Sequence, residues 1–169
     1  MIKGVRAIDG DWSELASEDI TAGEFPEGVL EWLDFEVIKV LALARKLSVA
    51  PMIPSPVAGS HVRHEGNSQH STKNKTRLSK GVDFFCRWKD AASIMEILRA
   101  IPEVGGLGIY TNMTFRGVVG GHAMIHMDLR KRRLEWVGWK VEPSNDLRYA
   151  YLAREPKRYH SILHEQAGW

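Results

Sequence analysis

Short apolar runs, separated by glycine, proline or charged residues, follow one another from Val82 onward and restrict the folds open to the chain. Several of these runs have the composition of buried strands, over 82–86, 107–110, 123–129 and 134–139. Only the polar link 131–133 separates the last two runs, so we expect them to form an antiparallel hairpin. No run approaches the roughly 20 apolar residues that a membrane helix needs. The sequence therefore predicts a soluble protein built around a sheet.

Helical patterns alternate with these strands. Asp34 is placed to cap a helix whose apolar residues recur at helical spacing. Asp90 is placed to cap a second helix with a similar apolar stripe. The segment 146–166 is mostly helical in composition, with an interruption at Pro156, and we expect it to pack across the outside of the sheet.

The length and the charge of the chain restrict its domain organisation and its partners. A chain of 169 residues suits one domain, 1–169, and we expect it to be a monomer. Its 23 basic and 21 acidic residues leave a net charge of +2, and the basic loop 73–80 holds no aromatic residue for stacking on bases, so we expect no nucleic-acid partner. The single cysteine, Cys86, excludes an internal disulfide, and the first residues lack the order of a signal peptide.

Three residues that can bind a metal ion stand at the edges of patterned segments: His70, Asp83 and His126. Two imidazoles and one carboxylate would leave zinc a fourth, open position, which distinguishes a catalytic zinc site from a structural one. Their wide spacing is a weak signal by itself. A surface histidine, a capping aspartate and a strand histidine bonded to the backbone would give the same pattern.

Sequence motifs around these residues strengthen the case. The stretches SQH at 68–70, KGVDF at 80–84 and IHMDLR at 125–130 together resemble the signature of zinc D-alanyl-D-alanine carboxypeptidases and related phage endolysins, a group of LAS-type metallopeptidases. The resemblance covers roughly residues 20–139. It implies the small Hedgehog/DD-peptidase domain, an α+β fold with an antiparallel sheet flanked by helices.

The resemblance also implies roles for individual residues. In this family the first histidine, the aspartate and the last histidine bind Zn²⁺, and these roles fall on His70, Asp83 and His126. A basic residue holds the carboxylate of the peptide substrate, and Arg63 is the candidate because a guanidinium can bind a carboxylate through two hydrogen bonds.

The chain departs from the family pattern in two places. The interval between His70 and Asp83 is longer than usual, which an insertion in the loop would explain at little cost in free energy. Many members also carry an acidic residue or a histidine shortly before the last zinc ligand, where this chain has Ala123 and Met124. His122 and Asp128 are expected to share a strand face with His126, and either is a candidate for the general base or for orienting a ligand.

The sequence therefore predicts a zinc-dependent peptidase that cuts the stem peptides of peptidoglycan, as a D-Ala carboxypeptidase or an endopeptidase of the endolysin type. The alternative is a non-catalytic zinc protein of the same fold, a phage component or a cell-wall-binding protein. In both cases we expect synthesis in the cytoplasm and action at the cell wall, during phage lysis or as part of a virion.

Overall fold

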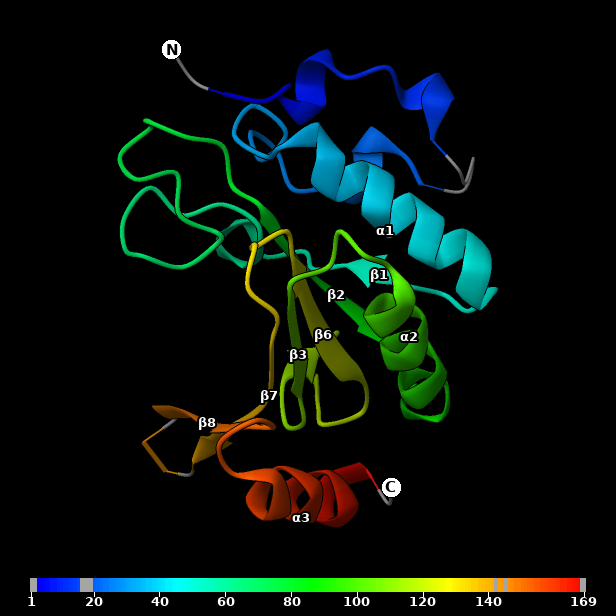
Figure 1. Ribbon diagram of the computed structural model, residues 1–169, viewed down its shortest axis with the longest axis vertical. Coiled ribbons are helices and arrows are strands. Elements are labelled where there is room, and N and C mark those ends of the chain that lie inside the picture. Colours follow the sequence, from blue (N-terminus) through cyan, green and yellow to red (C-terminus); the bar gives the residue numbers. More distant parts are fainter. Residues whose placement is uncertain (1–2, 16–19, 142, 145, 168–169) are drawn as a thin grey trace.

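The computed structural model describes residues 3–15, 20–141, 143–144 and 146–167 (Figure 1). Within these residues the chain forms three α-helices, α1 (Phe35–Ser48), α2 (Trp88–Ala100) and α3 (Pro156–Ala167). The strands are β1 (Ile53–Pro54), β2 (Gly81–Cys86), β3 (Gly106–Tyr110), β4 (Thr114–Phe115), β5 (Val118–Val119), β6 (Ala123–Asp128), β7 (Leu134–Val141) and β8 (Asp146–Tyr151). This mixture of helices with a mostly antiparallel sheet is compatible with the expected α+β class.

The main sheet has six strands in the order β1-β2-β6-β3-β7-β8, and β4 and β5 form a separate small sheet. All neighbours in the main sheet are antiparallel except β3 and β7, which run parallel. The expected hairpin between 123–129 and 134–139 is therefore wrong, because β3 lies between β6 and β7. The segment that joins β6 to β7 crosses the chain at Gly105, just before β3. The N–H of Gly105 donates to the carbonyl of Asp128, and its carbonyl accepts from the N–H of Leu134.

The first two helices lie where the apolar spacing predicts them. Helix α1 begins after Asp34, whose carboxylate accepts a hydrogen bond from the backbone N–H of Glu36, so this cap is confirmed. The cap predicted for α2 is wrong, because Arg87 occupies the N-cap position and Asp90 lies in the first turn. The Asp90 carboxylate accepts a hydrogen bond from Nε of Arg87 at 2.6 Å.

The C-terminal segment is only partly helical. Residues 146–151 form the strand β8, which pairs with β7, and the expectation of a mostly helical segment is wrong there. Pro156 does not interrupt a helix but begins α3, because proline is tolerated at a first helical position, where no N–H is needed. Helix α3 contacts β7 and β8 (Figure 1).

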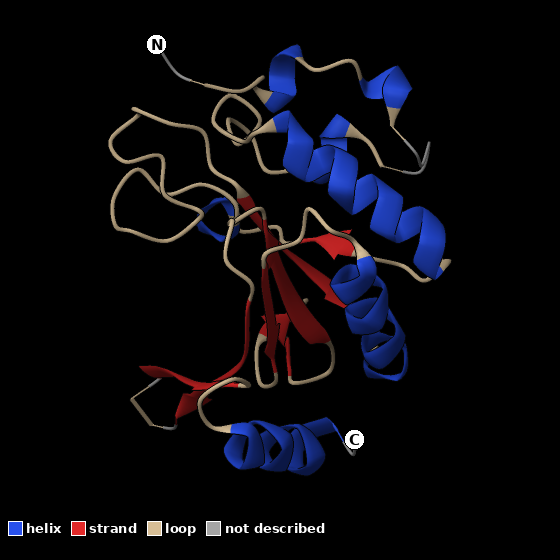
Figure 2. Ribbon diagram, viewed as in Figure 1, coloured by secondary structure: helices blue, strands red, loops and turns tan. Residues whose placement is uncertain are grey.

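The two faces of the main sheet have different surroundings. One face packs on a large apolar core shared with α1 and α2, which Figure 2 shows together at one side of the strands. Strand residues that belong to this core are Val82, Phe84, Cys86, Leu107, Ile109, Ala123, Ile125, Met127, Val137 and Ala150. The alternate residues point to the other face, where a smaller aromatic cluster lies. None of the helices in the described ranges is long and apolar enough to cross a membrane.

Candidate metal centre

The centre lies on the sheet face that the large core does not use. The register places Asp83 of β2 opposite His126 of β6, and His126 opposite Gly108 of β3. Gly108 in turn lies opposite Trp136 of β7, so these residues form one row across the sheet. Because residues in one such row point to the same face, antiparallel pairing alone brings the aspartate and the second histidine together.

His70 completes the group from a loop outside the sheet. Its backbone carbonyl accepts from the N–H of Arg63 at 2.8 Å, and the carbonyl of Gln69 accepts from Lys80 at 2.8 Å. The loop is thereby fixed to the start of β2, where Gly81 lies beneath both imidazoles. A Cβ at Gly81 would lie 3.1 Å from the ring of His126 and 3.2 Å from that of His70, so the absence of a side chain there lets the rings meet.

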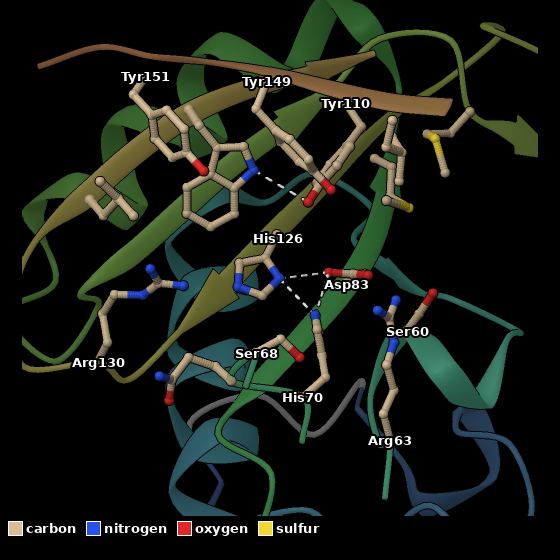
Figure 3. Close-up of a pocket in the computed structure, with 16 residues that line it drawn as sticks. Ser60, Arg63, Ser68, His70, Asp83, Tyr110, His126, Arg130, Tyr149 and Tyr151 are labelled. Carbon is tan, nitrogen blue, oxygen red and sulfur yellow. Dashed lines mark hydrogen bonds and ion pairs between the residues drawn. The ribbon is translucent and has the colours of Figure 1, made fainter. Parts of the chain in front are cut away.

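The three candidate ligands converge on one point (Figure 3). Nε2 of His70 lies 2.9 Å from Nδ1 of His126, and Oδ1 of Asp83 lies 2.8 Å from His126 Nδ1 and 3.3 Å from His70 Nε2. Donor atoms bound tetrahedrally to zinc at about 2.0–2.1 Å lie about 3.3 Å from one another. All three residues are buried, and together they can hold a metal ion.

Asp128 lies on the side of the His126 ring opposite to Asp83. Its Oδ2 is 2.8 Å from Nε2 of His126, and because a carboxylate only accepts, that nitrogen carries the proton. Nδ1 is thereby left as the lone-pair donor that a metal needs. Arg130 holds the carboxylate in place through Nε at 2.8 Å from Oδ1, and Asp128 is fully buried. This position suits orientation of a ligand, one of the two roles expected of Asp128.

The structure does not bring His122 to the metal centre. Its imidazole packs edge-on against Phe115, with 4.9 Å between ring centroids, beside the small sheet of β4 and β5. It is not among the residues that line the pocket above the ligands. The geometry therefore gives no support to a role for His122 as general base.

The three candidate ligands form the floor of a pocket of about 250 Å³. One wall is aromatic and comes from strands β3, β7 and β8, while the opposite rim is polar and comes from the loop before β2 (Figure 3). The lining residues other than the ligands include Tyr110, Trp136, Tyr149, Tyr151, Ser60, Arg63, Ser68 and Arg130. The sequence reasoning missed the aromatic wall, although the alternation of Leu147, Tyr149 and Tyr151 is the signal of a half-buried strand.

Arg63 lies in the same pocket, as expected of a residue that contacts substrate. Its Nε donates to the carbonyl of Gly59 at 2.7 Å, and its backbone pairs with the segment that carries His70. The side chain is exposed, so its remaining N–H groups can reach a carboxylate in the pocket.

The charges around the centre favour a cation. Burial opposes ionisation of Asp83, but the neighbouring imidazoles of His70 and His126 outweigh it and lower the pKa of this carboxyl. Burial would likewise lower the pKa of His126, but hydrogen bonds to Asp128 and Asp83 raise it to about 9. The protein thus stabilises positive charge at the point where a metal ion would bind.

Metal-free protein should lose stability as the pH rises through the range in which His126 loses its proton. The pKa of this imidazole is about 9 in the folded chain against 6.5 as its ordinary value, so its contribution is complete below pH 6.5 and lost as the pH passes about 9. The loss should be on the order of 3 kcal/mol. Urea unfolding of chelator-treated protein between pH 6 and 10 measures it, and a flat profile would contradict the proposed charge arrangement.

Comparison with protein-family models, with curated proteins and with solved structures gave no match to this chain. The case for any function therefore rests on the residues and their geometry.

Proposed function

We propose that the chain is a zinc-dependent peptidase that hydrolyses peptide bonds in peptidoglycan stem peptides, in a domain of the Hedgehog/DD-peptidase type. One observation carries the proposal: the histidine, aspartate and histidine selected by the sequence motifs lie in one buried group, with donor atoms 2.8–3.3 Å apart. If these were unrelated surface and capping residues, three side chains so distant in sequence would not be expected to converge.

The donor set suits zinc. Two neutral imidazole nitrogens and one carboxylate oxygen are a ligand set found in zinc peptidases, which leave a fourth position for water or substrate. A zinc ion bound here would supply a Lewis acid that polarises a carbonyl group and lowers the pKa of water to about 7. Asp128 would keep the imidazole of His126 in the binding tautomer, as hydrogen-bonded partners of zinc histidines do.

The pocket supplies binding groups for a short peptide. Arg63 on the rim would hold a peptide carboxylate through two hydrogen bonds, with Ser60 and Ser68 beside it. The aromatic wall would pack against small apolar side chains, such as the methyl group of D-alanine, and exclude water from the bond to be cut. We propose that the protein acts on the cell wall in this way, during phage lysis or as part of a virion.

One observation favours a second candidate, a non-catalytic zinc protein of the same fold. Among the described residues that line the pocket, Asp83 is the only carboxylate, and it belongs to the metal group. Ala123 and Met124 occupy the positions where many family members have a catalytic side chain. In this alternative the metal stabilises the fold and the pocket binds a wall peptide without cutting it.

Digestion of purified cell walls should separate the two candidates. Zinc-loaded protein should release new muropeptides, chelation should stop the release, and added zinc should restore it. The variant His126→Ala should be inactive, whereas His160→Ala, which removes an exposed histidine of α3, should retain full activity. Zinc in the wild-type protein without any digestion would favour the binding protein, and absence of bound zinc would contradict both.

A further inference from the structure

Three aromatic side chains of the pocket wall pack in a row. Nε1 of Trp136 donates to the hydroxyl oxygen of Tyr110 at 3.2 Å, and the ring of Tyr110 packs edge-on against that of Tyr149, with 6.2 Å between the ring centroids. Trp136 and Tyr110 are buried, whereas Tyr149 is 39% exposed. The row therefore starts inside the protein and ends at a tyrosine that substrate can reach.

The sheet is built to bring these rings together. Tyr110 of β3, Gly138 of β7 and Tyr149 of β8 lie in one row of the register. A Cβ at Gly138 would lie 2.6 Å from the Tyr110 ring, and one at Gly108 would lie 2.4 Å from the indole of Trp136. Both glycines leave space that an adjacent ring fills, so the contact between the rings depends on the absence of two side chains.

The bond between Trp136 and Tyr110 has a direction. An indole N–H only donates, so the hydroxyl oxygen of Tyr110 accepts. Burial raises the pKa of both phenols, so both hydroxyl groups keep their protons and can donate.

The exposed end of this row, Tyr149, lines the pocket together with the candidate metal ligands. Figure 3 shows the phenol rings of Tyr110 and Tyr149 across the pocket from His70, with their hydroxyl groups directed toward Asp83 and His126. The charge of Asp83 acts on both phenols, and that of Arg63 acts on Tyr149. The Tyr149 hydroxyl therefore faces the candidate metal ligands, in the same pocket as the arginine expected to hold substrate.

We propose that the hydroxyl of Tyr149, supported by Tyr110 and Trp136, donates a hydrogen bond to the oxygen of the scissile carbonyl as it becomes negatively charged. This inference rests on the proposed peptidase function. Water oxygen forms a bond to the carbonyl carbon, whose oxygen takes up the electron pair. The C–N bond then breaks, and the amine leaves with the proton that the water gave up. Tyr149 keeps its own proton throughout, so it is a transition-state donor and does not replace a general base.

The test compares phenol with benzene at the same position. In zinc-loaded protein, Tyr149→Phe should lower kcat on a D-Ala-D-Ala peptide about 100-fold, as loss of one oxyanion donor does, and change KM by less than about threefold. Tyr110→Phe should lower kcat by a smaller factor, because it acts only through Tyr149. Tyr151→Phe removes another phenol of the same wall and should cost clearly less than Tyr149→Phe.

A second measurement does not depend on turnover. A phosphinate analogue of the dipeptide carries a tetrahedral, charged centre, and calorimetry should show at least about 10-fold weaker binding to Tyr149→Phe than to wild type at equal zinc content. The product carboxylate should bind both proteins equally. This pair of ligands separates loss of a transition-state contact from general damage to the pocket.

The outcomes distinguish this inference from the proposed function. Wild-type activity that His126→Ala abolishes, with unchanged kcat in Tyr149→Phe, would overturn the tyrosine assignment alone. An equal loss in Tyr151→Phe would do the same. Inactive wild-type protein would contradict the peptidase and, with it, the inference. In an active protein, equal phosphinate binding to wild type and Tyr149→Phe would overturn the inference alone.

Discussion

Replacing Asp83 with alanine should abolish specific metal binding and all activity that depends on it. The variant removes the carboxylate of the candidate group formed by the described residues His70, Asp83 and His126 and leaves two imidazoles. Metal affinity should therefore fall by more than the roughly 10- to 100-fold typical of losing a partner that merely orients a ligand. Stability should also fall, because loss of one member of a buried charged pair costs about 3–5 kcal/mol. Metal analysis after dialysis and competition with a chelator measure the first effect, and urea unfolding the second.

Two further variants show whether a loss of metal merely reflects unfolding. Asp83→Asn keeps the shape of the side chain but removes its charge, and it should fold while binding zinc far more weakly than wild type. Asp9→Ala removes an exposed carboxylate paired with Arg6 and should bind one equivalent of zinc like the wild type. Full zinc occupancy in a folded Asp83→Asn protein at limiting zinc would show that Asp83 is not a ligand.

The variant Gly106→Ala should be among the most destabilising single substitutions in the chain. A Cβ at this position would lie 2.2 Å from Oδ2 of Asp128, far inside contact distance. That oxygen is buried and holds Nε2 of His126 at 2.8 Å, so the carboxylate cannot move without leaving a buried partner unsatisfied. We expect a loss of about 3–5 kcal/mol, a large part of the stability of an ordinary domain.

The same substitution should also weaken metal binding, because His126 would lose its orienting partner. Thermal and urea unfolding with and without zinc measure both effects. Gly23→Ala is the matched control, since the nearest atom to its new Cβ would be Oγ1 of Thr21 at 3.9 Å, and its stability should change by no more than about 0.5 kcal/mol. A Gly106→Ala protein as stable as Gly23→Ala would show that Asp128 does not occupy its described position.

The sequence predicted local elements better than their pairing. The apolar spacing and the Asp34 cap located α1, and short apolar runs located β2, β3, β6 and the start of β7. The hairpin was wrong because chain proximity suggested that β6 and β7 pair, whereas β3 provides partners for both. Pairing between distant segments depends on the whole sheet, and no local pattern records it.

The convergence of His70, Asp83 and His126 was predictable only because the surrounding motifs supplied what spacing could not. The aromatic wall of the pocket could not be predicted in this way, because its side chains come from separate strands that only the sheet register brings together. Tyr149 and Tyr151 lay in a segment interpreted as helical, although residues 146–151 alternate as a strand does. The reason for glycine at positions 81, 106 and 108 could not be read from the sequence, because it depends on the rings and the carboxylate that would contact a Cβ there.

The loop that supplies His70 also carries Arg63, and the two residues are joined by a backbone hydrogen bond. A metal ion that fixes His70 against the sheet would therefore restrict the arginine as well, so that occupancy of one site prepares the other. By thermodynamic linkage the effect is mutual, so a peptide bound by Arg63 would raise the affinity for the ion by the same factor. Metal binding and peptide binding would then be cooperative: the metal-bound protein would bind peptide more tightly, and bound peptide would slow the loss of the metal.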